Sequence, residues 1–294
     1  MSKGRLGTLG ILRELVRRRG SAIAIAFLAV VGFLAAFADF LGFDALHQNI
    51  LHSLEGPSAD YWFGTDELGR DIMSRVIYGA RTSLLAAGGA VLIAGAIGIP
   101  IGLVAGFFGG WRDAVLMRVV DVLLALPAIL FAMALIAVFG RSQGAALLAV
   151  GITGIPGFAR IVRAQVLSLR KRDFVVAVEA FGGTPGYNMF RTILPNSWNQ
   201  ILVQVVVLSS IAILLEAALA FLGVGVPPPT PSWGEMLRTG KTYLYEAPYY
   251  AVLPGVVLTL TILSFDTVGR TLTAIIEKTG GEEAPGEAVE GATR

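Results

Sequence analysis

Two carboxylates lie inside apolar stretches of the sequence, where they are the residues best placed to do chemistry. Asp121 lies about two helical turns inside the stretch 114–139, and Glu216 lies near the outer end of the stretch 198–222. A charge at the centre of a membrane helix costs about 3 kcal/mol unless it is paired or faces water, so such residues mark pathways, gates or proton relays. Arg118 shares a helical face with Asp121 and predicts a local ion pair. Glu216 has no basic residue within a turn, so it is the candidate for lining or gating a pathway, with a hydrogen bond to another helix or an external loop as the equal alternative.

Other chemical groups are scarce. The sequence has no cysteine, which excludes disulfides and thiolate metal ligands. Its two histidines, His47 and His52, lie in a polar loop without further metal ligands. The stretch 234–242 resembles a phosphate-binding loop but has one residue too many between its glycines. We therefore expect a chain that is not an enzyme and that holds no metal or cofactor itself.

The composition indicates a membrane protein. Hydrophobic residues make up 55% of the 294 residues and charged residues only 15%, with a mean hydropathy of +0.71. The formal net charge of +2 comes without a basic stripe, so we expect no nucleic acid as a partner.

Six stretches are apolar and long enough to cross a bilayer as helices, since about 20 residues span its hydrocarbon core. They are residues 21–41, 83–108, 114–139, 144–167, 198–222 and 250–272. Lys and Arg gather before the first stretch, after the fourth and after the sixth, which predicts that these segments, and with them both termini, are cytoplasmic. A cleaved signal peptide ending near Ala38 is the alternative for the first stretch, although its length favours a retained helix.

These stretches predict the organisation of the chain. Its parts are a cytoplasmic N-terminal segment (1–20), a first transmembrane helix (21–41), an external loop with a short amphipathic helix (42–82), a five-helix core (83–279) with a cytoplasmic loop (170–196) and an external loop (223–249), and a disordered cytoplasmic tail (280–294). In the first external loop Leu68, Ile72 and Val76 recur at helical spacing behind Asp66, which predicts an amphipathic helix capped by Asp66. The second stretch carries three glycines on one stripe, which predicts a close helix-packing face: Gly98, Gly102 and Gly106.

The polar, basic segment 170–196 separates the fourth and fifth stretches and is far longer than a turn requires. Gly182 and Gly183 suit the end of a helix, and Pro185 prevents its simple continuation. The segment therefore predicts a short helix over about 176–183 that contacts a partner.

Four blocks of the sequence resemble one transporter family. They are 63–81 (FGTDELGRDIMSRVIYGAR), 156–169 (PGFARIVRAQVLSL), 215–234 (LEAALAFLGVGVPPPTPSWG) and the segment 170–196. These blocks resemble the inner-membrane permeases of ATP-binding-cassette (ABC) importers, in the branch that carries dipeptides, oligopeptides and nickel. The last block is similar to the coupling loop of that family, which reads Glu-Ala-Ala, three residues, Gly, nine residues and Ile-x-Leu-Pro.

The coupling loop matches the family pattern only in part. Gly182, Leu194 and Pro195 are in register, whereas of the glutamate-alanine-alanine triplet only Ala177 matches and the glutamate is absent. Glu179 lies one helical turn farther along and is the candidate to replace it. The resemblance implies that the following residues contact an ATPase: Val176, Ala177, Val178, Glu179, Ala180, Gly182, Gly183, Leu194 and Pro195.

The resemblance also implies a fold and a function. The fold is an all-α polytopic membrane protein with six transmembrane helices, the type I ABC importer permease fold. The chain would form half of a peptide pathway in the inner membrane, surrounded by lipid, with a homologous permease subunit, two ATPase subunits that bind ATP and Mg²⁺, and an external substrate-binding protein. A permease for nickel or another small solute is the alternative, and a self-sufficient channel or ion-coupled transporter is a distant one.

Overall fold

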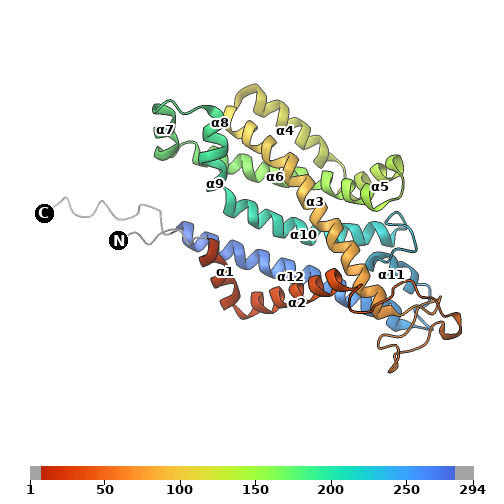
Figure 1. Ribbon diagram of the computed structural model, residues 1–294. Coiled ribbons are helices and arrows are strands. Elements are labelled where there is room, and N and C mark those ends of the chain that lie inside the picture. Colours follow the sequence, from red (N-terminus) through yellow and green to blue (C-terminus); the bar gives the residue numbers. More distant parts are fainter. Residues whose placement is uncertain (1–7, 282–294) are drawn as a thin grey trace.

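The computed structural model describes residues 8–281, and this part of the chain is built from helices without a β-strand. The helices are α1 (Thr8–Arg17), α2 (Arg19–Phe37), α3 (Ile72–Phe108), α4 (Gly110–Ala125), α5 (Ala128–Phe139), α6 (Gln143–Leu169), α7 (Asp173–Ala180), α8 (Pro185–Tyr187), α9 (Leu194–Asn196), α10 (Trp198–Phe221), α11 (Trp233–Gly240) and α12 (Pro248–Gly281), with a 3-10 turn η1 (Ile50–His52) and a π-helix η2 (Asn188–Ile193). The long helices run lengthwise, with α1, α7, α8 and α9 near one end and α11 near the other (Figure 1). We call these the α7 end and the α11 end.

Within residues 8–281, five helices are long and apolar enough to cross a membrane: α2, α3, α6, α10 and α12. The third expected span, 114–139, is not one helix, because it breaks into α4 and α5, whose axes differ by 91°. Leu126 has an extended backbone (φ −100°, ψ 139°) at the break. The ring of Pro127 disfavours a helical conformation in the residue before it, and Pro127 has no N–H to donate. The count of six spans therefore holds when α4 and α5 are taken as one broken span.

The glycine stripe of α3 packs against α6, as predicted. A Cβ added at Gly102 would lie 2.5 Å from the carbonyl oxygen of Ala159, and those added at Gly98 and Gly106 would lie 2.7 Å from atoms of α6. The backbones of α3 and α6 approach closely because these positions have no side chain. This contact forms the centre of the half of the molecule that contains α4 to α9.

The start of α3 differs from the expected amphipathic helix. The helix begins at Ile72 and continues through the membrane span, so the separate short helix capped by Asp66 does not form. Asp71 is the N-cap instead, and its carboxylate accepts hydrogen bonds from two amides of the first turn. Gly69 has a φ of +69°, and a Cβ there would lie 1.8 Å from the carbonyl oxygen of Asn49, so the backbone before α3 turns away from the helical conformation.

A buried ion-pair network joins the loop 38–71 and α11 to the start of α3. Arg75, which is 2% exposed, lies 3.2 Å from the carboxylate of Asp66 and 3.3 Å from that of Glu235 in α11. The indole N–H of Trp233 donates to the carbonyl oxygen of Val76 at 2.9 Å. The predicted loop 223–249 thus contains a helix that is fixed to the core.

The N-terminal segment packs on the last helix. Helix α1 begins within the predicted segment 1–20, and α2 starts at Arg19 and ends at Phe37. Buried apolar side chains of α1 and α12 form one cluster at the α7 end: Ile11, Leu15, Leu272, Ile275 and Ile276. Helix α12 runs to Gly281, and the rest of the predicted tail, 282–294, lies outside the described residues.

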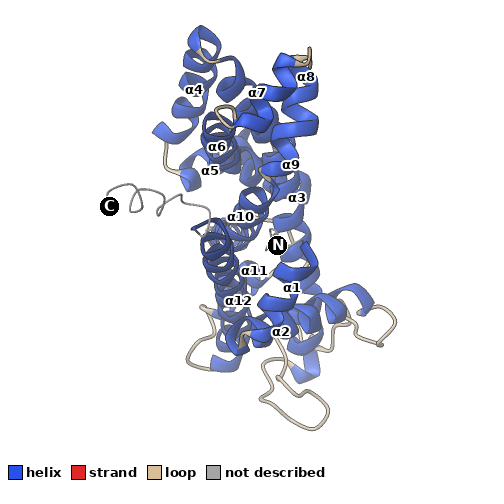
Figure 2. Cartoon of the chain, turned by 90° about the vertical axis from the view of Figure 1, so that its left-hand side faces the viewer, coloured by secondary structure: helices blue, strands red, loops and turns tan. Residues whose placement is uncertain are grey.

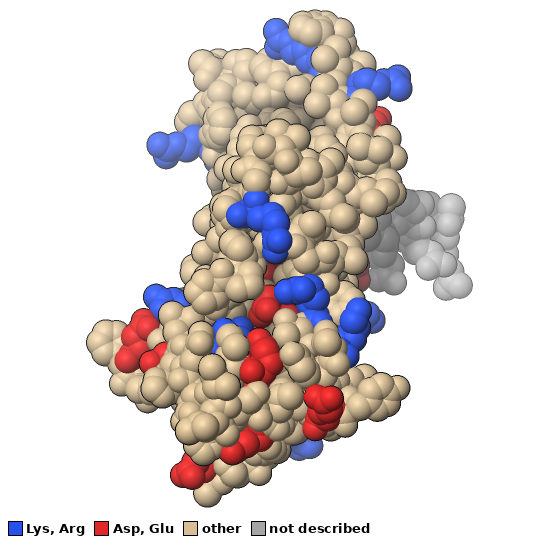
Figure 3. Space-filling model, turned by 90° about the vertical axis from the view of Figure 1, so that its right-hand side faces the viewer, with Lys and Arg blue, Asp and Glu red and all other residues tan. Residues whose placement is uncertain are grey.

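Helix α10 connects two groups of helices. Figure 2 shows α4 to α7 in the upper part of the molecule and α1, α2, α11 and α12 in the lower part, with α10 between them. Helix α10 contacts α3, α6 and α12. Seen from the α11 end, acidic side chains gather over the lower part, whereas basic side chains are spread over both parts (Figure 3).

Candidate coupling surface

The nine residues expected to contact an ATPase all lie at the α7 end, between α6 and α10. Helix α7 contains five of them, from Val176 to Ala180, and Gly182 and Gly183 follow after the C-cap residue Phe181. Leu194 and Pro195 form the first two residues of α9. The helix starts three residues earlier than predicted, at Asp173, and ends at Ala180.

Helix α7 ends in a Schellman motif. Gly182 has a φ of +83°, its amide donates to the carbonyl oxygen of Glu179 at 3.0 Å, and the amide of Gly183 donates to that of Val178 at 2.8 Å. A Cβ on Gly183 would lie 2.5 Å from Cγ1 of Val178, whereas a Cβ on Gly182 would meet nothing within 4 Å. Gly182 is therefore required for its backbone conformation, and Gly183 for its close contact.

One side chain anchors α7 to the rest of the chain. Val175 is fully buried in a cluster with Leu169 at the end of α6 and with Met189 and Ile193 of η2. The other residues of α7 are exposed or partly exposed. Burial of one valine contributes about 1.5 to 3 kcal/mol, so this contact fixes the helix while leaving most of its surface open.

A polar contact connects α7 with η2. The Asn188 side-chain amide donates to a carboxylate oxygen of Glu179 at 3.3 Å, and Asn188 is fully buried. Glu179, the candidate substitute for the missing family glutamate, is itself exposed. Glu179 therefore lies at the surface, and its hydrogen bond with Asn188 helps to hold α7 against η2.

Pro195 explains the π-helix that precedes it. A proline at this position has no N–H for the carbonyl four residues earlier, and its ring clashes with that carbonyl in an α-helix. The turn widens, and the amide of Leu194 donates to the carbonyl oxygen of Met189, five residues back. The Leu-Pro pair thus sets the geometry by which the segment joins α10.

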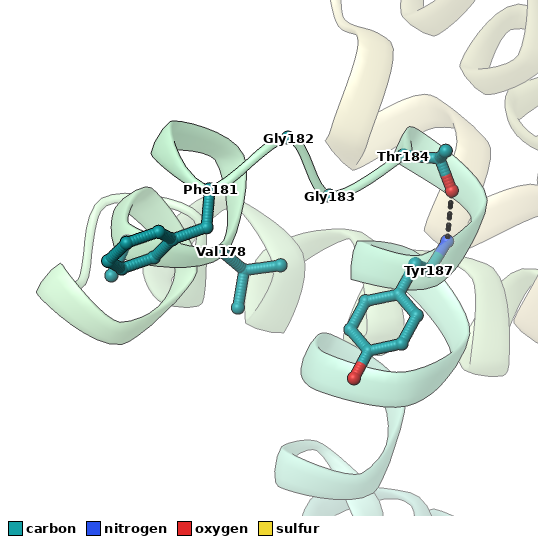
Figure 4. Close-up of a pocket in the computed structure, with 7 residues that line it drawn as sticks. Val178, Phe181, Gly182, Gly183, Thr184 and Tyr187 are labelled. Carbon is teal, nitrogen blue, oxygen red and sulfur yellow. Dashed lines mark hydrogen bonds between the residues drawn. The ribbon is translucent and has the colours of Figure 1, made fainter.

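Four exposed apolar side chains form what we call the coupling surface: Val176 (51% exposed), Phe181 (92%), Tyr187 (55%) and Phe190 (56%). An open hollow of about 510 Å³ lies between α7 and α8, and Ala177, Val178, Phe181, Gly182, Gly183, Thr184 and Tyr187 line it. Val178 and Tyr187 flank the hollow beneath the Gly182–Gly183 connection, and the ring of Phe181 lies beyond Val178, on the side away from Tyr187 (Figure 4). Sequence reasoning missed the three aromatic residues, although large rings in an otherwise polar segment were the available signal.

Glu216 does not reach the surface of the described chain. Its side chain is 1% exposed, and the hydroxyl of Ser83 in α3 donates to its carboxylate at 2.9 Å. Of the two roles considered, the structure shows the hydrogen bond to another helix directly. The contact joins α3 to α10 near the α11 end.

Asp121 pairs with a different arginine from the one predicted. Arg160 of α6 donates to its carboxylate at 2.7 Å, whereas Arg118 makes no ion pair with any residue in 8–281. The expected pair along α4 is wrong because the carboxylate points toward α6, which the spacing within one helix could not reveal. A second pair, between Arg163 and Asp113, joins the same two helices with two hydrogen bonds of 2.6 Å.

Comparisons with known proteins agree with this architecture. Residues 98–279 match the family described as binding-protein-dependent transport system inner membrane component. The chain is 39% identical to the dipeptide transport system permease protein DppC of Alkalihalophilus pseudofirmus, covering 88% of this chain and 86% of the relative. It is 38% identical to the glutathione transport system permease protein GsiD of Pectobacterium atrosepticum, with coverages of 88% and 87%.

Solved structures share the fold. A chain of the inward-facing MetNI methionine ABC transporter superposes with a TM-score of 0.57 at 18% identity, covering 71% of this chain and 97% of that chain. A chain of an amino acid ABC transporter gives a TM-score of 0.53 at 16% identity, with coverages of 70% and 94%. The helices thus have the type I ABC importer permease fold. The chain belongs to the family of inner-membrane components of binding-protein-dependent transport systems.

Proposed function

We propose that the chain forms half of the pathway of an ATP-driven importer of short peptides. The relatives quoted above are named for dipeptide and glutathione transport, and both kinds of cargo are short peptides with charged ends. Identity of 38 to 39% over 88% of the chain supports the same cargo class here.

The coupling surface is the observation that carries the proposal. Exposed aromatic and branched side chains in a segment outside the lipid are characteristic of protein docking sites. We assign the partner as a cytoplasmic ATPase subunit, which would bind ATP and Mg²⁺ itself. A homologous permease subunit, a second ATPase subunit and an external substrate-binding protein would complete the complex.

The distribution of positive charge supports the orientation. Basic residues gather in α1, at the start of α2, in the segment around α7 and in the last turns of α12: Arg13, Arg17, Arg18, Arg19, Arg170, Lys171, Arg172, Arg191, Arg270 and Lys278. Lys and Arg are enriched in the cytoplasmic loops of membrane proteins. We therefore place the α7 end, with both termini, in the cytoplasm and the α11 end outside.

Movement of an ATPase would pass to the membrane helices through α7. Val175 and the Glu179–Asn188 contact hold α7 against η2, which continues into α10. On the other side, the guanidinium of Arg170 donates to the carbonyl oxygens of Gly106 and Phe107 at the end of α3, at 3.3 Å each. A displacement of α7 would thus move α3, α6 and α10 together, as in rigid-body switching.

We further propose that Glu216 responds to this movement. Its contact with Ser83 joins α3 to α10, so a separation of these helices would open the carboxylate toward the pathway.

Reconstitution tests the proposed function. The complete complex in proteoliposomes should take up a radiolabelled dipeptide only with ATP, both ATPase subunits and loaded binding protein. Uptake by this chain alone would identify a self-sufficient channel. Uptake of Ni²⁺ without uptake of peptides would assign the cargo to the alternative class.

A further inference from the structure

A half-exposed charged pair joins two membrane helices, α4 and α6. Arg160 and Asp121 keep 55% and 51% of their side-chain surfaces exposed while they pair at 2.7 Å. Asp121 lies about 16 Å along α4 from its first residue, and Arg160 about 14 Å from the last residue of α6. Both distances place the pair inside a hydrocarbon core of about 30 Å, on the side of the α7 end. Lipid solvates such a pair poorly, so this face requires water or protein in the assembled transporter.

The exposed surface of α4 has two stripes of different composition. One stripe is entirely apolar, and each residue is more than half exposed: Val115 (53%), Val119 (56%) and Val122 (62%). The second stripe runs beside the first along the helix. It consists of charged or small residues, which are also exposed: Ala114, Arg118, Asp121 and Ala125. We call this second set the charged stripe. Hydrocarbon accepts the valines readily but not the charged stripe, so the two stripes face different surroundings.

The broken span places irregular backbone next to the charged stripe. Helix α4 ends at Ala125, and α5 leaves at 91° after Pro127. Pro127 lacks the N–H that would bond to the carbonyl of Leu123, so the break exposes a polar backbone group close to Asp121. In membrane transporters, helices interrupted at mid-depth line substrate cavities, because unpaired backbone is tolerated only there or inside protein.

We propose that the charged stripe, together with Arg160, lines the water-filled part of the pathway and receives the charged ends of a short zwitterionic peptide. The cargo in this proposal rests on the proposed function. Asp121 offers a carboxylate to the peptide's ammonium group, and Arg160 and Arg118 offer guanidinium groups to its carboxylate. Arg118 has no acidic partner in residues 8–281, so it is available without breaking a pair. Opposite charges on one surface complement both ends of such a peptide, whereas a lipid tail complements neither.

Single-cysteine variants test whether the charged stripe is exposed to water, because the natural sequence contains no cysteine. The variant is Ala125→Cys and the matched control is Val122→Cys, one turn away on the apolar stripe. The complete complex in proteoliposomes is treated with a membrane-impermeant methanethiosulfonate, and modification of this chain is followed. Ala125→Cys should react at least roughly tenfold faster than Val122→Cys, since the reactive thiolate forms in water and not in lipid. Slow reaction at Ala125→Cys, or equal rates at both positions, would overturn the proposal by placing the stripe against lipid or a partner helix.

Transport kinetics test the cargo separately. Asp121→Asn and Arg160→Gln should each lower the kcat of dipeptide uptake at saturating loaded binding protein. The KM for the loaded binding protein should stay unchanged, since the pair lies far from the α11 end. An unchanged kcat with fast labelling at Ala125→Cys would refute the contact with cargo. Fast labelling at Ala125→Cys, combined with no peptide uptake by the wild-type complex, would refute the proposed function but leave the water-exposed surface standing.

Discussion

The amide of Gly183 donates to the carbonyl oxygen of Val178 at 2.8 Å, and a Cβ on Gly183 would lie 2.5 Å from Cγ1 of the same valine. The end of α7 is thus fixed by a hydrogen bond and by close packing, both between Gly183 and Val178. Because α7 ends without a free hinge, a force on its exposed face would pass to η2 and α10, as the proposed coupling requires.

Gly183→Ala should weaken the closure of α7. The added methyl group meets both the side chain and the carbonyl of Val178, which costs about 1 to 3 kcal/mol. Gly182→Ala carries only backbone strain of about 1 kcal/mol, because its Cβ meets nothing. The ATPase stimulation caused by loaded binding protein should therefore fall more in Gly183→Ala than in Gly182→Ala. Equal stimulation in the two variants would contradict the assigned contact.

Gly182→Trp should uncouple transport from ATP hydrolysis. The Cβ direction at Gly182 points into open space beside the coupling surface, so the indole would occupy the region assigned to the ATPase. Gly182→Ala is the control, because it introduces the same backbone strain at Gly182 without the bulk of the indole. The measurement is ATPase activity of the reconstituted complex with and without loaded binding protein, after equal assembly has been checked. Unchanged stimulation in Gly182→Trp would argue against docking here.

Glu216→Gln and Glu216→Leu should behave differently. The amide of glutamine can still accept the hydrogen bond from Ser83, whereas leucine leaves a buried hydroxyl unpaired at a cost of about 1 to 3 kcal/mol. We expect Glu216→Leu to lower the thermal stability of the detergent-purified complex and Glu216→Gln to leave it nearly unchanged. Dipeptide uptake by the stable Glu216→Gln variant then tests whether the charge of Glu216 is needed for gating. Loss of uptake would show that the charge itself is needed when α3 and α10 separate.

Gly102→Val should disrupt the α3–α6 contact. A side chain at Gly102 meets backbone of α6 at 2.5 Å, whereas one at Gly88, on the same helix, meets nothing within 4 Å. Gly102→Val should reduce the yield and thermal stability of folded permease, and Gly88→Val should reduce neither. Similar yields for both variants would show that α3 and α6 separate easily, contrary to their close packing.

Much of the fold follows from local sequence patterns. Apolar length predicted the helices because each membrane helix satisfies its backbone hydrogen bonds within itself. The stripe of Gly98, Gly102 and Gly106 predicted a packing face because spacing along one helix determines which residues share a side. Gly182 and Gly183 predicted the end of α7 for the same local reason.

Features that depend on contacts between distant segments were not predicted. Asp121 was assigned to Arg118 in its own helix, but its partner Arg160 lies 39 residues away. The contact between Glu216 and Ser83 spans 133 residues, and hydropathy carries no signal for it. Hydropathy does not predict the break at Pro127, because the stretch 114–139 stays apolar across it. The proline itself is the local feature that indicates a break in the helix.

Cross-linking at Phe181 shows whether the end of α7 docks on an ATPase subunit. Phe181→Cys introduces the only thiol of this chain at its most exposed coupling residue, and Val16→Cys in α1, 59% exposed near the same end, is the control. The assembled complex is treated with a short thiol-to-amine cross-linker, and products are identified by mass spectrometry. We expect a covalent product between this chain and the ATPase subunit for Phe181→Cys and none for Val16→Cys. No ATPase product from Phe181→Cys, or equal products from both positions, would contradict it.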